Sequence, residues 1–488
     1  MHEFEPVIGL EVHAELQTSS KMFCGCKVVD SISAEPNTAV CEICTGMPGS
    51  LPVINKRAVE YALRVALALH CEISEISVFA RKNYFYPDLP KGFQISQYEL
   101  PLAHNGWLLI DTGEGEKRIR IRRVHIEEDT GKLSHRPGYS LVDYNRSGVP
   151  LLEIVSEPDL NSLEEVKSYA TSLRSILRYL KVNSGDMEKG VIRFEANVSV
   201  RPIGSDVFGI RTEIKNLNSF RAMEHALAYE VDRQSRLTAR GEQVIQETVG
   251  WDEASGITVS QRGKEEAHDY RYFPEPDLPP LYEDPVWVEE IRESLPELPH
   301  TKMKRFITQY HLTPYIANVL IAERDVADYF ESAVSSAPDI SASKIANWLS
   351  SDFFGLLNEA GISIDQSKVS PENLAELVRL VEDGEINAGS GKMVLEHMFH
   401  SGEQATSIVE KRGLKQITDP AMIHQFVREV LSSHPEQLQQ YLDGKQSLQQ
   451  WFFGQAMQAM GGQADPSLLQ PILNEALQDI EKGNRSPE

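Results

Sequence analysis

The hydrophobic pattern of this chain changes once, at a proline-rich stretch beyond its middle. Before that stretch, segments in which apolar and polar residues alternate, as in β-strands, are interleaved with segments of helical period. Residues 272–280 and 295–299 are rich in proline and predict stiff, extended connections. Beyond them only helical periods are found. We therefore predict an α+β fold, in which a large, cradle-like N-terminal domain with a mostly antiparallel sheet precedes two all-α domains.

Chain length also favours several domains, because 488 residues exceed what one hydrophobic core usually serves. We expect domains at 1–294, 295–405 and 406–488. Helices are expected at 57–70, at 162–180 behind the capping box Ser162-Leu163-Glu164-Glu165, after Ser219, at 345–357 and at 420–431.

Composition narrows the class of protein. A hydrophobic content of 41% and a charged content of 25% are typical of globular proteins with real cores. We find no secretory signal pattern and no run approaching the roughly 18 apolar residues of a membrane span, so we expect a cytoplasmic protein without membrane contact. The net charge of −24 argues against a general nucleic-acid coat, although a local basic patch or a partner subunit can contact phosphates.

The first strand-like segment carries chemistry on one of its faces. Ile8, Leu10, Val12, Ala14 and Leu16 share one face, and Gly9, Glu11, His13, Glu15 and Gln17 share the other. A half-buried strand with a solvated polar face has this pattern. Alternatively, Glu11 and His13 converge on a cation, since neighbours two residues apart suit shared ligation.

Two further segments favour the interpretation that Glu11 and His13 bind a cation. Glu153 lies inside the apolar run 151–155, and an unpaired buried charge is costly, so it needs an arginine or a metal as partner. Segment 124–129 clusters acids after the basic run 118–123. Carboxylates with at most one imidazole suit Mg²⁺ better than zinc. Strand parity leaves Glu127 and Glu128 open as the ligand from this segment.

Two more predicted strands also have one apolar face and one charged or polar face. One face of segment 192–201 and one face of segment 210–215 are charged or polar; these residues are Arg193, Glu195, Asn197, Ser199, Arg201, Arg211, Glu213 and Lys215. A solvated sheet face has the same pattern. Several such faces, together with Glu153, indicate the floor of a polar cleft, where cations meet phosphates and carboxylates hold metal, as phosphoryl transfer requires.

Four of the five cysteines form a metal-binding pattern. Cys24, Cys26, Cys41 and Cys44 give C-x-C-x14-C-x2-C, which predicts a closed, structural zinc site in the loop 24–44, with coincidence or an iron–sulfur cluster as alternatives. Cys71 is expected to be a core thiol. Residues 389–392, GSGK, resemble a phosphate loop but lack its first glycine, its Ser/Thr and a preceding strand.

Longer stretches carry a family resemblance. The segments VDYNRSGVPLLEIVSEP (142–158), IGLEVH (8–13), RKNYFYPD (81–88) and EIKNLNSF (213–220) resemble the B subunit, GatB, of aspartyl/glutamyl-tRNA(Asn/Gln) amidotransferases. The resemblance spreads over the first ~280 residues and is weaker in the helical remainder, which ends in what looks like a tRNA-contacting tail domain. The tail departs from the family pattern at one place. Segment 457–466 carries no lysine where the family motif usually has several, so we expect weaker charge contacts to tRNA phosphate there.

The resemblance implies a reaction and a set of residues. The B subunit would use ATP and Mg²⁺ to phosphorylate the side-chain carboxylate of Glu or Asp misacylated on tRNA(Gln) or tRNA(Asn). Ammonia from an amidase subunit (A) would then displace phosphate, in a heterotrimer with a small subunit (C). By position, Glu11, His13, Glu128 and Glu153 match the metal-binding residues, with Glu128 favoured over Glu127. The candidate nucleotide-binding residues are Lys82, Arg193, Lys215, Asn145 and Arg146.

Rival interpretations make different predictions. A non-catalytic, zinc-containing tRNA-binding scaffold would pair Glu153 with an arginine and join no divalent ion to Glu11 and His13. A carboxylate kinase for a small free metabolite would work without tRNA and leave the helical tail unexplained. The archaeal-type sister subunit would carry a synthetase-like insertion, which we do not find.

Overall fold

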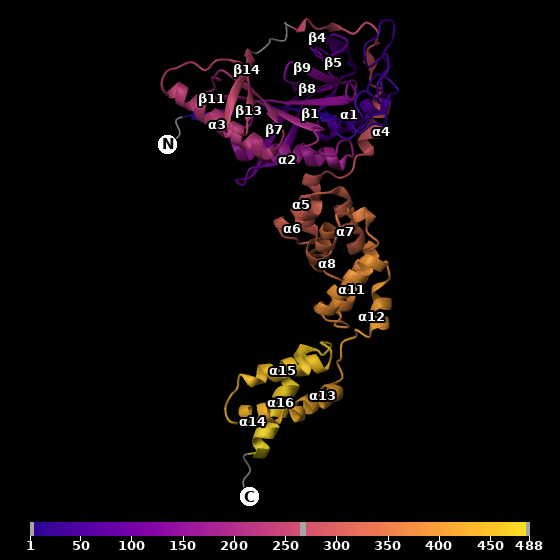
Figure 1. Ribbon diagram of the computed structural model, residues 1–488, viewed down its shortest axis with the longest axis vertical. Coiled ribbons are helices and arrows are strands. Elements are labelled where there is room, and N and C mark those ends of the chain that lie inside the picture. The colour runs from indigo at the N-terminus through magenta and orange to yellow at the C-terminus, as the bar shows by residue number, and fades with distance from the viewer. Residues whose placement is uncertain (1–3, 264–269, 485–488) are drawn as a thin grey trace. The chain divides into compact units, whose positions relative to one another are not determined.

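The computed structural model describes residues 4–263 and 270–484 (Figure 1). The chain divides into two compact units, Met1–Lys302 and Met303–Glu488. The division falls inside helix α5 (Pro299–Gln309), a little beyond the first boundary expected from the sequence. Whether the second unit acts as two domains stays a prediction.

One large sheet organises the first unit. Its strand order is β14-β13-β12-β11-β1-β10-β7-β6-β2, and every neighbouring pair is antiparallel except β12 and β13. The strands are β1 (Phe4–Glu15), β2 (Glu72–Ile73), β6 (Ala103–Asp111), β7 (Glu116–Glu128), β10 (Pro150–Ser156), β11 (Ile192–Pro202), β12 (Thr212–Leu217), β13 (Glu247–Asp252) and β14 (Ile257–Gly263).

The two faces of this sheet differ in chemistry. The face predicted to be apolar in β1 is buried, with Ile8, Leu10, Val12 and Ala14 all at most 1% exposed. Helices α1 (Lys56–Ala68), α2 (Leu163–Tyr179) and α3 (Phe220–Ala239) pack against that face and complete its core. In Figure 1, α2 and α3 run along one side of the sheet, and β4, β5, β8 and β9 lie on the other.

Small sheets border the polar face. A three-stranded sheet has the order β15-β4-β5, and two two-stranded sheets pair β16 with β3 and β8 with β9. Their strands, with the last helix of this unit, are β3 (Ile76–Ser77), β4 (Phe79–Asn83), β5 (Phe93–Gln97), β8 (Lys132–Arg136), β9 (Tyr139–Asp143), β15 (Phe273–Pro274), β16 (Leu281–Tyr282) and α4 (Pro285–Glu293).

The named elements of the second unit are all helical. Its buried apolar side chains form two clusters, one within 306–409 and one within 423–477. The elements after α5 are α6 (Pro314–Ile321), α7 (Arg324–Ser336), α8 (Ala342–Trp348), the π-helical turn η2 (Leu349–Phe353), α9 (Phe354–Ala360), the 3₁₀ turn η3 (Ile364–Gln366), α10 (Pro371–Glu382), α11 (Ala388–Ser401), α12 (Ala405–Arg412), α13 (Pro420–Ser433), α14 (Pro435–Leu442), α15 (Leu448–Ala459) and α16 (Pro466–Asn484). Among the described residues, no helix combines the length and apolar character needed to span a bilayer.

The predicted fold class is confirmed, since a mixed α/β region with a large sheet precedes a helical region. Helix α2 begins as predicted, and the Ser162 hydroxyl accepts the Glu165 N–H at 3.1 Å. The Glu165 carboxylate instead accepts the N–H of Asn161 and pairs with Lys117, so the capping box is incomplete. The single helix expected at 345–357 is interrupted by η2.

The GSGK segment lies in the first turns of α11, so its rejection as a phosphate loop is supported. A Cβ on Gly391 would lie 2.9 Å from both Trp348 and Val381, which shows that this glycine serves close packing between helices.

Gly106 in β6 offers a test of how tightly the first core is packed. A Cβ at this position would lie 2.3 Å from the Cys71 sulfur and 2.6 Å from the Leu69 carbonyl oxygen. Gly106→Ala should therefore destabilise the protein by about 1–3 kcal/mol through overpacking. Urea unfolding of the two proteins measures the difference. As a control, Gly355→Ala in α9 meets nothing within 4 Å and should stabilise its helix slightly. Equal stability of Gly106→Ala and the unmodified protein would contradict the packing described.

Candidate active site and metal centre

Four ionisable side chains form a row across the polar face of the large sheet. Antiparallel pairing sets His13 of β1 opposite Arg193 of β11 and opposite Glu153 of β10, and Glu153 in turn opposite His125 of β7. Residues directly opposite on neighbouring strands are side-chain neighbours. Strand register alone therefore brings together groups far apart in the sequence.

Glu153 lies at the centre of this row and is 4% exposed. Its Oε2 lies 3.3 Å from His125 Nε2 and 3.4 Å from His13 Nε2, and its Oε1 lies 3.4 Å from an Arg123 nitrogen. Burial opposes ionisation, but the neighbouring imidazoles outweigh it and hold the pKa of the Glu153 carboxyl well below its usual range. The predicted need for a partner is met by two imidazoles and an arginine.

Two further carboxylates complete the cluster. His13 Nε2 lies 3.6 Å from Glu11 and 3.8 Å from Glu127. Burial and repulsion from Glu153 raise the pKa of Glu11 to about 7. Burial lowers the pKa of His13, but its hydrogen bond to Glu153 and the surrounding carboxylates raise it to about 9. The protonation states of Glu11 and His13 thus depend on the charges of their neighbours, as expected in a cluster that binds a cation.

The donor atoms suit a divalent cation. The ligand atoms of Glu11, His13 and Glu153 lie within 4.8 Å of one another, and so do those of His125, Glu127 and Glu153. The Nδ1 atoms of both histidines are buried and have no hydrogen-bond partner in the described part of the chain. Hard carboxylate oxygens with an imidazole are a donor set that Mg²⁺ accepts.

The structure separates the two candidates from segment 124–129. Glu127 shares the polar face with His125, and its Oε2 accepts a hydrogen bond from Ser96 at 3.0 Å. The Glu128 carboxylate pairs with Lys91 and accepts the Ile95 N–H at 3.0 Å. Glu127 therefore lies within the cluster, and the assignment of Glu128 as a ligand stays a prediction from resemblance.

The candidate nucleotide-binding residues fall into two groups. Arg193 pairs with Asp129 at 2.8 Å and Lys215 with Glu195 at 2.6 Å, so both border the carboxylates. Lys82 on β4 lies 5.0 Å from the ring centre of Tyr270. Burial opposes its charge, but the groups around it, including Glu127 and Glu153, raise the Lys82 pKa well above its usual value.

Asn145 and Arg146 make structural contacts. Asn145 accepts the Ala39 N–H at 2.9 Å and donates to the Glu35 carbonyl at 2.8 Å. Arg146 donates to the carbonyl oxygens of Thr130 and Gly131, and its Nε lies 3.6 Å from Asp129, the carboxylate that also pairs with Arg193. Their contacts hold loops together, and their role in nucleotide binding stays a prediction.

An arginine-lined cavity of about 620 Å³ opens beside Glu11. Asn197, Ser199 and Arg211, from the predicted polar cleft, line it, but sequence reasoning did not assign Arg122 and Arg123 to it. Its lining residues are Val7, Gly9, Leu10, Glu11, Arg122, Arg123, Val155, Ser156, Pro158, Asn197, Ser199, Phe208, Gly209, Ile210, Arg211 and Gln246. Both Arg122 and Arg123 reach it because β7 bulges opposite Val155 and Ser156. The sequence carries a sign of this bulge. Apolar residues stand two apart at Ile119 and Ile121 and again at Val124 and Ile126, but Ile121 and Val124 are three apart.

The four predicted zinc ligands come together. The sulfurs of Cys24, Cys26, Cys41 and Cys44 lie within 4.8 Å of one another. A hydrogen bond from the Cys24 thiol, aided by the Cys41 N–H and the Lys21 ammonium, lowers the pKa of Cys44 to about 4 despite its burial. Lys21 is fully buried, with its Nζ 3.6 Å from the Cys44 sulfur. Thiolates facing a buried lysine fit a closed tetrahedral zinc site.

The zinc-loop cysteines are tied to the segment that leads into β10. The Ser147 hydroxyl donates to the Cys44 carbonyl at 3.0 Å, and the Met22 N–H donates to the Gly148 carbonyl at 2.7 Å. The metal-binding loop therefore supports the chain just before Glu153.

Comparisons with known proteins identify the family. Residues 6–289 match the family model described as the GatB/GatE catalytic domain, and residues 328–477 match the model described as the GatB domain. The first match spans all residues of the carboxylate cluster and the four cysteines.

Relatives match over nearly their whole length. The chain is 52% identical to the B subunit of the aspartyl/glutamyl-tRNA(Asn/Gln) amidotransferase of Persephonella marina, over 97% of this chain and 100% of the relative. It is 51% identical to the corresponding protein of Moorella thermoacetica, over 97% of this chain and 100% of the relative. It is 49% identical to that of Thermodesulfovibrio yellowstonii, over 98% and 100%. The resemblance that the sequence motifs indicated is thereby confirmed, and the chain belongs to the GatB family of aspartyl/glutamyl-tRNA amidotransferase B subunits.

Proposed function

We propose that this subunit phosphorylates the side-chain carboxylate of Glu or Asp attached to tRNA, and that the activated acyl group is then amidated. One carboxylate oxygen attacks the γ-phosphorus of ATP and ADP leaves; ammonia then displaces phosphate and gives the amide. The observation that carries the proposal is the buried Glu153 between two imidazoles, beside a cavity of about 620 Å³ lined by arginines.

The carboxylate cluster would hold Mg²⁺. Glu11, His13 and Glu153 form the core of the proposed site, with Glu127 or Glu128 as a further ligand. When bound, the ion neutralises phosphate oxygens during phosphoryl transfer. The imidazoles keep Glu153 ionised, so the chain presents a ready ligand at neutral pH. Burial of the cluster in a low-dielectric region strengthens its electrostatic interactions.

The arginine-lined cavity suits the nucleotide. Its volume is in the range of small-molecule sites, and Arg122, Arg123 and Arg211 supply cations for phosphates. Ile210 supplies apolar surface for a base. Lys82, Arg193 and Lys215 border the other side of the cluster and stay candidates for contacts to phosphates or to the substrate carboxylate.

Zinc and partner subunits complete the proposal. Four sulfur ligands leave no open position, so Zn²⁺ would be architectural. None of the cysteines is available as a glutaminase nucleophile, so ammonia would come from the amidase subunit (A), in a heterotrimer with the small subunit (C). The isolated chain would not use glutamine.

One observation favours the scaffold alternative. Glu153 pairs with Arg123 at 3.4 Å, as a purely structural carboxylate would. That ion pair does not account for the two imidazoles or for the pKa of Glu11 near 7. Substitution of Glu153 separates the two functions.

Glu153→Gln removes a ligand charge and keeps the side-chain shape. In the reconstituted heterotrimer it should slow ATP-dependent formation of the phosphorylated intermediate by on the order of 10³-fold, because several kcal/mol of transition-state stabilisation are lost. Labelled ATP with misacylated tRNA(Gln) and tRNA(Asn), with and without an ammonia donor, measures this rate and the substrate preference. Zinc content should not change.

Glu230 provides the matched control. It is also a fully buried glutamate of the first unit and pairs with Arg233 at 2.6 Å, but it lies outside the cluster. Glu230→Gln should lower stability and leave the rate per folded enzyme close to normal. If Glu153→Gln behaves like Glu230→Gln, the scaffold alternative is correct.

Paired substitutions decide between Glu127 and Glu128. From the contacts, Glu127→Gln should reduce Mg²⁺ affinity about 10-fold or more, whereas Glu128→Gln should mainly break the pair with Lys91. Titration of Mg²⁺ against the phosphorylation rate measures both. The reverse order would support Glu128 as the ligand.

Cys41→Ser tests the zinc site. The unmodified chain should contain about one zinc, and the variant should lose it and melt at least about 5 °C lower, since structural zinc contributes folding free energy. Metal analysis and thermal unfolding measure the two effects. Cys71→Ser, outside the four-sulfur group, should retain zinc. A zinc-free unmodified chain with the same melting temperature as the variant would contradict the site.

A further inference from the structure

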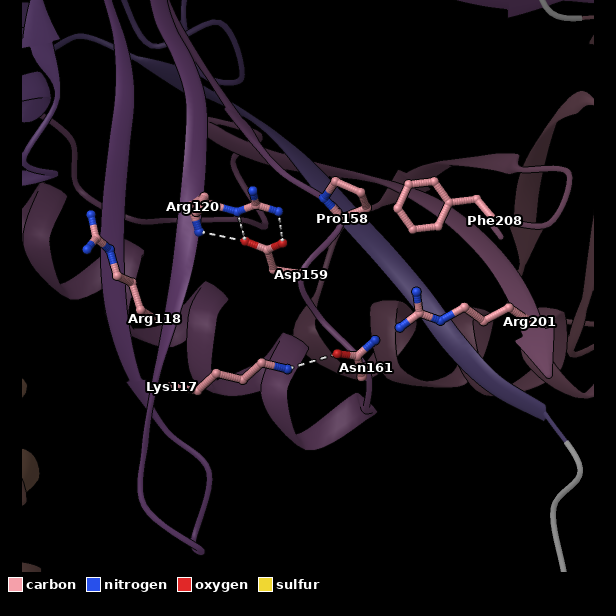
Figure 2. Close-up of a pocket in the computed structure, with 8 residues that line it drawn as sticks. All are labelled: Lys117, Arg118, Arg120, Pro158, Asp159, Asn161, Arg201 and Phe208. Carbon is pink, nitrogen blue, oxygen red and sulfur yellow. Dashed lines mark hydrogen bonds and ion pairs between the residues drawn. The ribbon is translucent and has the colours of Figure 1, made fainter. Parts of the chain in front are cut away.

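A second cavity, of about 680 Å³, lies next to the arginine-lined cavity, and the two share Pro158 and Phe208. Figure 2 shows its lining residues, which are Lys117, Arg118, Arg120, Pro158, Asp159, Asn161, Arg201 and Phe208. Three of its four cations have carboxylate partners: Arg120 pairs with Asp159, Lys117 with Glu165 and Arg201 with Glu5. Arg118 has none among the described residues, and Arg120 stays exposed, so these two arginines point to an anionic ligand.

The cations are arranged in a line along β7. Arg118, Arg120 and Arg122 alternate with the buried Ile119 and Ile121, so they share the polar face of the sheet. Beyond the bulge the same face continues with Arg123 and then His125 and Glu127. Alternate strand residues are about 7 Å apart, which is comparable with the spacing of successive phosphates in an extended polynucleotide. The line therefore leads from the second cavity to the carboxylate cluster.

Ion pairs hold two of these arginines in place without covering them. Arg120 pairs with Asp159 at 2.6 Å and Arg122 with Glu157 at 2.7 Å, yet their side chains are 65% and 53% exposed. A guanidinium has five N–H groups, so one engaged with a carboxylate can still donate to a second anion.

Arg118 is different. Its described contact is with the Trp107 ring, whose centre is 4.6 Å from the guanidinium carbon, and within residues 4–263 and 270–484 it has no carboxylate partner. The opposite side of the cavity carries Phe208, which is 60% exposed and lies where the two cavities meet. An exposed aromatic ring beside a line of cations is the combination by which proteins bind single-stranded nucleic acid.

We propose that this second cavity, with Arg118 and Arg120 of β7, binds the sugar–phosphate backbone of the single-stranded 3′ end of the substrate tRNA, and so guides its aminoacyl group to the carboxylate cluster. This inference rests on the proposed function, because that function places the aminoacyl group at the cluster. A free phosphate would need only one of these cations. A linear array that ends at the reacting group fits a chain of phosphates better.

The test removes one charge at the far end of the line. Arg118→Gln in the reconstituted heterotrimer should weaken binding of uncharged tRNA about three- to tenfold and reduce the slope of log K against log salt by about 0.7, as for one lost phosphate contact on a single strand. Neither change should occur with tRNA shortened by its single-stranded 3′ nucleotides. Arg118→Lys should retain most of the affinity, and the KM for ATP should be unchanged.

Arg236→Gln is the matched control, because Arg236 is 70% exposed on α3 and lines neither cavity. It should leave both affinities unchanged. Equal binding of intact tRNA by Arg118→Gln and the unmodified complex would overturn the inference, and so would an equal loss with intact and shortened tRNA. Impaired subunit assembly in sedimentation with normal tRNA affinity would identify a protein contact and also overturn it. Because binding is measured without ATP, failure of the phosphorylation proposal would be seen separately, in the Glu153→Gln assay.

Discussion

The buried charge of Glu153 is the constraint on which the rest of the first unit depends. A carboxylate at the centre of a nine-stranded sheet is costly unless it is paired and hydrogen-bonded. His13 and His125, on the two neighbouring strands, meet that requirement. The strand order β1-β10-β7 therefore sets the order in which His13, Glu153 and His125 lie across the site. A slip of one residue in either pairing would remove an imidazole from the polar face.

The two faces of the large sheet have different roles, one in the stability of the fold and one in its chemistry. Its apolar face packs on α1, α2 and α3 and forms one continuous core, whereas its polar face carries the ionisable groups. A residue on the polar face can be matched to substrate, metal or nucleotide without changing the packing beneath it. The cost is electrostatic, since Glu11 and Glu15 both have a pKa raised to about 7 by burial among other acids. A cation bound at the cluster would relieve the repulsion between Glu11 and Glu153.

Much of this arrangement could be predicted from the sequence, because strand parity is a local property. It separated the faces of β1 and β11, identified Glu153 as a charge in need of a partner and grouped the four cysteines. Properties that depend on long-range pairing could not be predicted. No role for His125 follows from its own segment, because only the β10–β7 register sets it beside Glu153. A polar cleft was predicted, and Asn197, Ser199 and Arg211 line the first cavity, but the contributions of Arg122 and Arg123 depend on the bulge in β7, and the second cavity depends on loops from distant parts of the chain.

That bulge has a consequence for how the chain tolerates change in length. Ile119 and Ile121 precede it and Val124 and Ile126 follow it, and all four point into the same core. Removing Arg122 or Arg123 would restore regular pairing and leave all four of these residues in the core, but it would take away one of the two arginines that the bulge brings to the cavity. Deleting a residue elsewhere in β7 would instead turn one half of the strand over. The extra residue of the bulge is therefore needed by the cavity and not by the core.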